Sequence, residues 1–305
     1  MRIGIPKEKN EGETRVAIVP ISIPKLLKLG FEVVIEKGAG EKSGYTDTEY
    51  EEKGAKTKTL DEVMKCELIA SIDVPDFKNM EKGQMLACVA DPFRNLQQTK
   101  KIIEAGITLL SLEVIPRRLS KGQSMDVNSS QDNLSGYKAA LMGSQHIAKM
   151  VPMMMTSAGT VRPAKFVIQG AAVAGLQAIA TAKRLGGAIQ AIDVRLAAKQ
   201  DTESLGAKFI DVPGWKDAES SSGHASLFTD KDLQNAFDNA LMNAVKDADV
   251  VITTARLFGA DAPKLFFGKE NNEKMTKEMK EGSVIVDMNT DTGGNIVGSK
   301  EGEII

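Results

Sequence analysis

At 305 residues the chain is long enough for two domains, each with its own hydrophobic core. Its composition is 42% hydrophobic and 26% charged with a net charge of −2, which leaves no basic excess for nucleic acid or anionic lipid. No apolar run approaches the roughly 18 residues that span a bilayer, and the N-terminus lacks a signal-peptide pattern, so we expect no direct membrane insertion. Cys66 and Cys88 lie in apolar segments, where small buried thiols of a reducing compartment are expected, and with only His146 and His224 no metal site is expected.

The first part of the chain alternates short apolar runs with amphipathic stretches. The pattern predicts strands at residues 2–5, 32–36, 68–72, 84–89 and 107–114. It predicts helices at residues 21–29, 60–65 and 96–105. Strands that alternate with helices indicate a mostly parallel sheet covered on both faces, so we expect an N-terminal α/β domain at residues 1–130.

The second part repeats this alternation after a longer helical pattern at residues 133–151, which we interpret as an interdomain helix. Strands are predicted at residues 165–169, 188–194, 208–212, 249–253 and 283–287. Helices are predicted at residues 173–185, 197–204, 231–246 and 272–280. Between residues 213 and 228 the chain is polar and rich in serine, which is typical of a mobile loop. Residues 131–305 are therefore predicted to form a second α/β domain.

A dinucleotide-binding pattern opens the second domain, in KFVIQGAAVAGLQAIATAKRLGGAIQAIDVR. Gly170 can make the turn after the strand, and Gly175 permits close packing of helix on sheet. The helix N-terminus then presents free N–H groups to a pyrophosphate. Asp193 ends the next strand, where a carboxylate can accept both ribose hydroxyls of NAD and repel the 2′-phosphate of NADP. The nucleotide-contacting residues predicted here are Gly170, Ala172, Val173, Gly175, Asp193, Val194 and Arg195.

Ala172 departs from this pattern, because it stands where the backbone must approach the pyrophosphate most closely. A methyl group at that point could weaken phosphate binding. The alternative interpretation is that the two glycines only make a tight turn between strand and helix in a domain without nucleotide.

The chain resembles a known family over essentially its whole length. The segments that carry the resemblance are QSMDVNSSQDNLSGYKAA, PMMMTSAGTVRPAKFVIQGAAVAGLQAIATAKRLGG, DVVITTA and GSVIVDMNTDTGGN. They are similar to the NAD(H)-binding domain I of proton-translocating NAD(P) transhydrogenase, in the form where that domain is a separate chain. The N-terminal IGIPKEKNEGETRVAIVP is shared by that family and by alanine dehydrogenases.

This resemblance implies two Rossmann-like domains, a homodimer, and NAD(H) in the cleft of the second domain. It also implies membrane-embedded and NADP(H)-binding partner subunits, with this chain peripheral to the complex on the cytoplasmic or matrix side. Hydride would pass from NADH to NADP⁺ held by a partner subunit. Family chains run several dozen residues beyond the GGN that ends at Asn295, so the C-terminus is expected to be shorter than the family's.

The resemblance further implies a nicotinamide-binding loop, with Arg118, Gln123, Asp126 and Ser129 as its catalytic residues. Arg and Gln can fix the carboxamide and the facing redox partner, while Asp and Ser complete a hydrogen-bonded frame. The alternative for Arg118 is an ordinary solvated charge. The remaining residues expected to contact the cofactor are Ser124, Met125, Gly223, Ala255 and Arg256.

Three functions stay open at this point: a transhydrogenase subunit, an alanine dehydrogenase-like enzyme, and a truncated, non-catalytic nucleotide-binding or interaction module. Oxidising an amino acid requires a general acid or base. Alanine dehydrogenases carry a Lys and a His for this in the first domain, whereas the corresponding segments here read SIDVPDF and ACVADPF. Hydride transfer between two nicotinamides moves no substrate proton and needs only positioning in a dry cleft, so the sequence favours transhydrogenation. Arg15 is shared by both families and does not discriminate between them.

Overall fold

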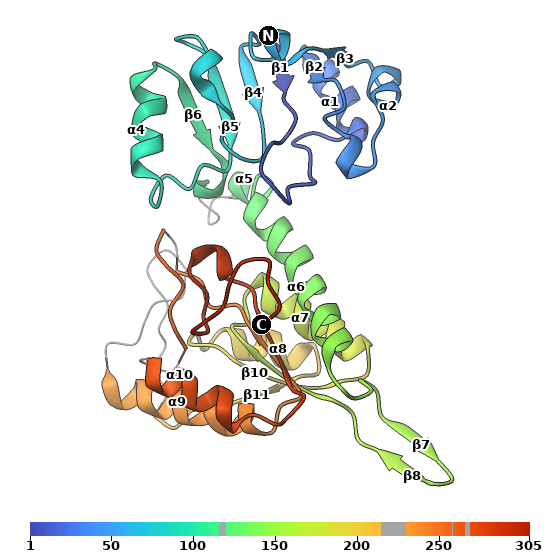
Figure 1. The fold of residues 1–305 in the computed structure, drawn as a ribbon, viewed down its shortest axis with the longest axis vertical. Coiled ribbons are helices and arrows are strands. Elements are labelled where there is room, and N and C mark those ends of the chain that lie inside the picture. Colours follow the sequence, from blue (N-terminus) through green and yellow to red (C-terminus); the bar gives the residue numbers. More distant parts are fainter. Residues whose placement is uncertain (116–119, 215–229, 258, 266–268) are drawn as a thin grey trace. The chain divides into compact units, whose positions relative to one another are not determined.

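The computed structural model describes residues 1–115, 120–214, 230–257, 259–265 and 269–305. The chain divides into two compact units, Met1–Val127 and Asn128–Ile305 (Figure 1). Each unit contains its own parallel sheet with helices around it. The expected α/β fold with two mostly parallel, Rossmann-like sheets is confirmed.

Unit 1 is built on a six-stranded sheet in the order β3-β2-β1-β4-β5-β6, in which every neighbouring pair is parallel. The strands are β1 Arg2–Ile5, β2 Glu32–Glu36, β3 Lys56–Lys58, β4 Leu68–Ala70, β5 Met85–Cys88 and β6 Thr108–Ser111. The helices are α1 Ile23–Lys28, α2 Asp47–Glu52, α3 Leu60–Val63, α4 Leu96–Glu104 and the short α5 Ser120–Gln123.

Alternation along β2 shows how this sheet is covered on both faces. Val33 and Ile35 pack into one cluster with Ile23 of α1 and Tyr50 of α2. Val34, which points to the other face, packs with a second cluster that includes residues of α3 and α4. Because both faces are buried, the central strands are almost wholly apolar, as parallel sheets require.

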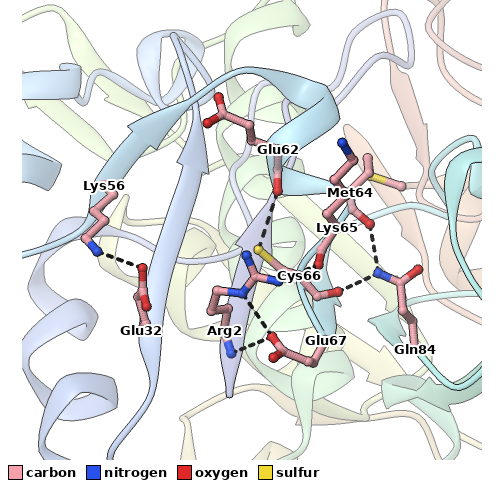
Figure 2. Close-up of polar contacts among 9 residues, drawn as sticks. All are labelled: Arg2, Glu32, Lys56, Glu62, Met64, Lys65, Cys66, Glu67 and Gln84. Carbon is pink, nitrogen blue, oxygen red and sulfur yellow. Dashed lines mark hydrogen bonds and ion pairs between the residues drawn. The ribbon is translucent and has the colours of Figure 1, made fainter.

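Side chains fix the turn between α3 and β4 (Figure 2). Gln84 Nε2 donates to the carbonyl oxygens of Met64 and Cys66 at 2.8 and 2.6 Å. Arg2 donates to the Lys65 carbonyl oxygen at 2.8 Å and pairs with the carboxylate of Glu67. The turn therefore has its carbonyl groups satisfied, and Cys66 is held in the core beneath it.

Both cysteines are free and completely buried, as the sequence predicts. Burial raises the pKa of the Cys66 thiol, and it raises the pKa of Cys88 to about 12. Since the thiolate is the reactive form, both residues act as small hydrophobic core residues.

Unit 2 is built on a five-stranded parallel sheet in the order β11-β10-β9-β12-β13. The strands are β9 Lys165–Gln169, β10 Ala188–Ile192, β11 Lys208–Phe209, β12 Val250–Thr253 and β13 Val284–Asp287. The helices are α6 Val127–His146, which begins at the last residue of unit 1, α7 Val173–Arg184, α8 Ala198–Ser204, α9 Lys231–Lys246 and α10 Lys269–Glu278. Two further strands, β7 Met154–Thr156 and β8 Gly159–Val161, form a separate antiparallel hairpin.

Two helix layers enclose this second sheet. Phe166 and Ile168 of β9 pack with Ile179 of α7 in a cluster that also takes in α6 and α8. Val167, between them on the strand, packs on the opposite face with Phe237 of α9. The order of the strands reverses between β9 and β12, so the carboxyl ends of these two strands flank the point where open α/β sheets bind their ligands.

The predicted helix at residues 133–151 has different bounds in the structure, where α6 runs from Val127 to His146. The early start places Asn128, Ser129 and Ser130 in the first turn, where such residues are well tolerated because the helix N–H groups there are free. Gly136 lets α6 cross α7 closely, since a Cβ on it would lie 2.0 Å from the Ala174 carbonyl oxygen.

Candidate dinucleotide site

The turn between β9 and α7 needs glycine at two positions. Gly170 has a φ of +93°, which L-residues rarely adopt, and a Cβ on it would lie 2.2 Å from Thr254 Oγ1. A Cβ on Gly175 would lie 1.8 Å from the Gly170 carbonyl oxygen. The first turn of α7 therefore packs directly against the backbone of the loop, and this is the cradle in which a pyrophosphate would lie.

Ala172 is the N-cap residue of α7 and has ordinary extended backbone angles, φ −84° and ψ −165°. Its side chain is exposed, and Val173 after it is half-buried. Among the residues that the structure describes, no side chain caps this end of the helix. The methyl group of Ala172 thus stands beside free helix N–H groups without straining the backbone.

Ala172→Gly is expected to strengthen NADH binding by about 1 kcal/mol, the scale of one small steric conflict. Isothermal titration calorimetry of both proteins measures the difference. Ala197→Gly is the matched control, because Ala197 is the exposed N-cap residue of α8 and lies outside the predicted contact set. Unchanged or weaker binding in Ala172→Gly would mean that the backbone already accommodates the methyl group or that no nucleotide binds there.

Asp193, directly after β10, is 4% exposed and links two loops. Its Oδ2 accepts from the Ala171 backbone N–H at 2.7 Å, and its Oδ1 accepts from the Arg195 backbone N–H at 2.8 Å. The Arg195 guanidinium adds bonds from Nε to Oδ1 and from Nη2 to Oδ2, both at 2.9 Å. Asp193 therefore lies beside the glycine turn, with Val194 and Arg195 half-buried next to it.

The loop after β12 completes this edge of the sheet. Thr254 Oγ1 lies 3.1 and 3.0 Å from the carbonyl oxygens of Gln169 and Gly170. The Ala255 carbonyl oxygen accepts from the side-chain amides of Asn289 and Asn295, at 3.1 and 2.8 Å. The loop backbone is therefore fixed from both sides.

Arg256 forms an ion pair with Asp291 at 2.9 Å, and both side chains are exposed. Asp291 lies in the segment after β13 that also carries Asn289 and Asn295. Thr254, Asn289 and Asn295 are absent from the predicted contacts, although the TTA and GGN motifs contain two of them.

The structure places the predicted nicotinamide-binding residues only in part. Gln123, Ser124 and Met125 are exposed at the end of α5, and Asp126 and Ser129 are half-buried where α6 begins. Gln123 and Asp126 belong to unit 1, whereas Ser129 belongs to unit 2. Arg118 and Gly223, together with most of the predicted loop at residues 213–228, lie outside the described residues.

In unit 1, Arg15 forms a bidentate pair with Glu13, at 2.9 and 2.6 Å. The hydrogen bonds from Arg15 lower the pKa of Glu13. Glu8, which is 8% exposed, accepts from the backbone N–H of Ile72, and burial raises its pKa. Arg15 and Glu8 thus have carboxylate and backbone partners of their own, which accounts for their place in the fold without a substrate.

Within the described ranges, no group of three or more His, Cys, Asp or Glu side chains is arranged to hold a metal ion. No helix in these ranges is both long enough and apolar enough to cross a membrane. The chemical groups gathered at the carboxyl edge of the unit 2 sheet are a glycine turn, an open helix end and a buried carboxylate.

The parallel sheet, the glycine turn and the acidic residue after the second strand place this protein in the class of two-unit α/β proteins with a Rossmann-like dinucleotide fold. Family models match over both units, as "Alanine dehydrogenase/PNT, N-terminal domain" at residues 4–135 and "Alanine dehydrogenase/PNT, C-terminal domain" at residues 139–305. The chain belongs to the alanine dehydrogenase/PNT family.

Similar proteins within this family fall into two kinds. The first of the two chains that make up the NAD(P) transhydrogenase subunit alpha of Rhodospirillum rubrum is 40% identical, with 100% of this chain and 81% of the relative covered. "Alanine dehydrogenase" of Methanococcus maripaludis is 31% identical, with 97% and 74% covered. The crystal structure of transhydrogenase from Sinorhizobium meliloti is 38% identical with a TM-score of 0.88, covering 100% of this chain and 83% of that one. The resemblance inferred from the sequence is confirmed.

Proposed function

We propose that the chain is the NAD(H)-binding subunit of a proton-translocating NAD(P) transhydrogenase, which passes hydride from NADH to NADP⁺ held by a partner subunit. The observation that carries the proposal is the whole-chain similarity to transhydrogenase alpha subunits, at 40% identity in Rhodospirillum rubrum. The glycine cradle and the buried carboxylate of Asp193 support NAD(H) as the cofactor.

The chemistry in this proposal is hydride transfer, which bound NADH supplies. Residues of this chain need only hold the two reacting rings in place and exclude water, since no substrate proton is moved. Gly170, Gly175 and the first turn of α7 would hold the pyrophosphate, and Asp193 the adenosine ribose. Arg118, Gln123, Asp126 and Ser129 would orient the nicotinamide. Proton translocation would reside in membrane-embedded partner subunits, with this chain peripheral to them on the cytoplasmic or matrix side.

The proposal includes a homodimer. The hairpin β7–β8 is exposed in all its residues and carries Met154, Met155 and Val161 outward, next to exposed Met153. A two-stranded hairpin with apolar side chains is marginal in water by itself, so a second copy of the chain would give it a surface to pack on. Light scattering of the purified chain tests this, and a monomer at all concentrations would contradict it.

An alanine dehydrogenase-like activity is the second candidate, because that family shares the fold and Arg15. In this structure the Arg15 guanidinium is bound to Glu13, and no histidine precedes His146 in the sequence. Unit 1 therefore offers no histidine for proton transfer to an amino acid. Alanine-dependent reduction of NAD⁺ above background would favour this second function over the first.

The test of the proposed cofactor is a comparison of NADH and NADPH binding by calorimetry. The wild-type protein should prefer NADH, and Asp193→Ala should weaken NADH binding about tenfold or more, the cost of losing hydrogen bonds to a charged group. The same change should narrow the preference, since it removes the carboxylate and frees Arg195 to face a 2′-phosphate.

Asp201→Ala is the matched control for this experiment, because it removes an exposed carboxylate from α8. Thermal unfolding without nucleotide identifies any loss caused by misfolding of Asp193→Ala. Equal or tighter binding of NADPH by the wild-type protein would overturn the proposed cofactor.

A further inference from the structure

The carboxylate of Asp193 has no acceptor position left for a ligand. A carboxylate offers about four lone-pair positions, two on each oxygen. Oδ1 accepts from the backbone N–H and from Nε of Arg195, at 2.8 and 2.9 Å. Oδ2 accepts from the backbone N–H of Ala171 and from Nη2 of Arg195, at 2.7 and 2.9 Å. The residue expected to bind the ribose is thus fully occupied by its own chain.

These hydrogen bonds fall into two kinds. Two come from backbone N–H groups, which the glycine turn and the loop after β10 fix in place. The other two come from a single guanidinium, which can turn away by side-chain rotation. A ribose with free 2′- and 3′-hydroxyls also donates two hydrogen bonds, so the guanidinium fills the positions that the ribose would use.

Burial makes this occupation persistent. Asp193 has a side-chain exposure of 4% and Arg195 one of 20%, so the pair is largely shielded from water. Bidentate pairs between Arg and a carboxylate are among the stronger charge-assisted hydrogen bonds and are geometrically specific. An exposed ion pair would yield to a ligand at little cost, but this one must be broken.

We propose that the Arg195 guanidinium is an intramolecular competitor for the adenosine ribose site, and that NADH engages Asp193 only after Arg195 has moved aside. This inference rests on the proposed function, since it takes NADH as the ligand. It assigns Arg195 a part in specificity. While the pair is closed, the guanidinium neutralises the charge that would repel a 2′-phosphate; once Arg195 has moved away, the carboxylate is unopposed.

The test is the variant Arg195→Met, which keeps an apolar stem of similar length and removes all side-chain donors. NADH should bind about fivefold more tightly, a factor equivalent to roughly one net hydrogen bond. NADPH should not gain, so the preference for NADH should widen. Arg184→Met is the matched control, because Arg184 is exposed in the last turn of α7 and its loss changes the net charge equally. It should leave both affinities unchanged.

A double-mutant cycle shows whether the gain depends on Asp193. In an Asp193→Ala background, Arg195→Met should give no gain in NADH binding. An equal gain there, or weaker NADH binding in the single variant Arg195→Met, would overturn the proposal, since Arg195 would then act elsewhere or contact the nucleotide directly.

Nuclear magnetic resonance of the wild-type protein provides a measurement that needs no stable variant. The Arg195 Nε–H signal should be protected from solvent exchange in the free protein and lose that protection when NADH is bound. Protection that persists at saturating NADH would contradict the inference while leaving the proposed function intact. If neither the wild-type protein nor Arg195→Met binds NADH, the proposed function itself fails.

Discussion

Gly175→Ala should destabilise the protein by about 3 kcal/mol and weaken NADH binding by more than about tenfold. The added Cβ would lie 1.8 Å from the carbonyl oxygen of Gly170 and 2.8 Å from its carbonyl carbon. These are backbone atoms of the turn, so no side-chain rotation relieves the collision. Either α7 moves away from β9 or the turn rearranges, and both changes displace the N–H groups that would hold the pyrophosphate.

The sign of the stability change makes this test decisive. Helix propensity alone predicts that Gly→Ala inside a helix stabilises it by about 1 kcal/mol. A lower midpoint in chemical denaturation therefore isolates the steric collision from the propensity. Arg184→Ala, at an exposed position on the same helix, should leave the midpoint nearly unchanged. A raised midpoint for Gly175→Ala would show that α7 lies farther from the turn than 1.8 Å implies.

The β9–α7–β10 unit could be predicted from the sequence because its signals are local. Gly170 must adopt a positive φ, Gly175 must lack a side chain, and Asp193 must end the next strand, so each residue type follows from its own position. The bounds of β9 and of α9 were predicted without error for the same reason, since apolar periodicity marks them clearly.

Short or polar elements were missed. The helix α2 has a capping box between Thr46 and Glu49 that could have revealed it. The strand β3 reads KTK and pairs only with β2 at the sheet edge, where no buried face imposes an apolar pattern. The hairpin β7–β8 is exposed throughout and shows no alternation of buried and exposed residues, so its sequence lacks the signal of a strand.

The partners of the site residues depend on the three-dimensional fold. Asp193 and Arg195 are two residues apart, and only the loop conformation after β10 turns the guanidinium back onto the carboxylate. Asn289 and Asn295 reach the Ala255 carbonyl oxygen from more than thirty residues away in the sequence. Periodicity and motif spacing carry no information about such contacts, because they are set by packing between elements.

Gln123→Ala should remove most hydride transfer to NADP⁺ in a reconstituted complex while leaving NADH affinity nearly intact. Misplacement of a reacting group by about 1 Å can lower a rate by roughly a hundredfold. The Gln123 side chain is exposed at the end of the short helix α5, so its loss leaves no cavity in a core. We therefore expect the thermal midpoint to stay within the error of the wild-type value.

The control is Gln145→Ala, which removes another exposed glutamine amide, near the C-terminal end of α6. It should leave transfer, NADH affinity and stability unchanged. Single-turnover transfer from bound NADH to an NADP⁺ analogue separates the chemical step from nucleotide binding.

The competing explanation is that the segment containing Gln123 only supports the start of α6. Gln123 contributes its carbonyl oxygen to the turn that leads into that helix, accepting from the Asp126 backbone N–H at 3.4 Å. Alanine keeps this backbone bond, so a purely structural role of the side chain would lower the midpoint and NADH affinity together. A selective loss of transfer supports orientation of the nicotinamide, because only that role separates rate from binding. If the wild-type chain transfers no hydride with a competent partner, the transhydrogenase proposal fails irrespective of Gln123.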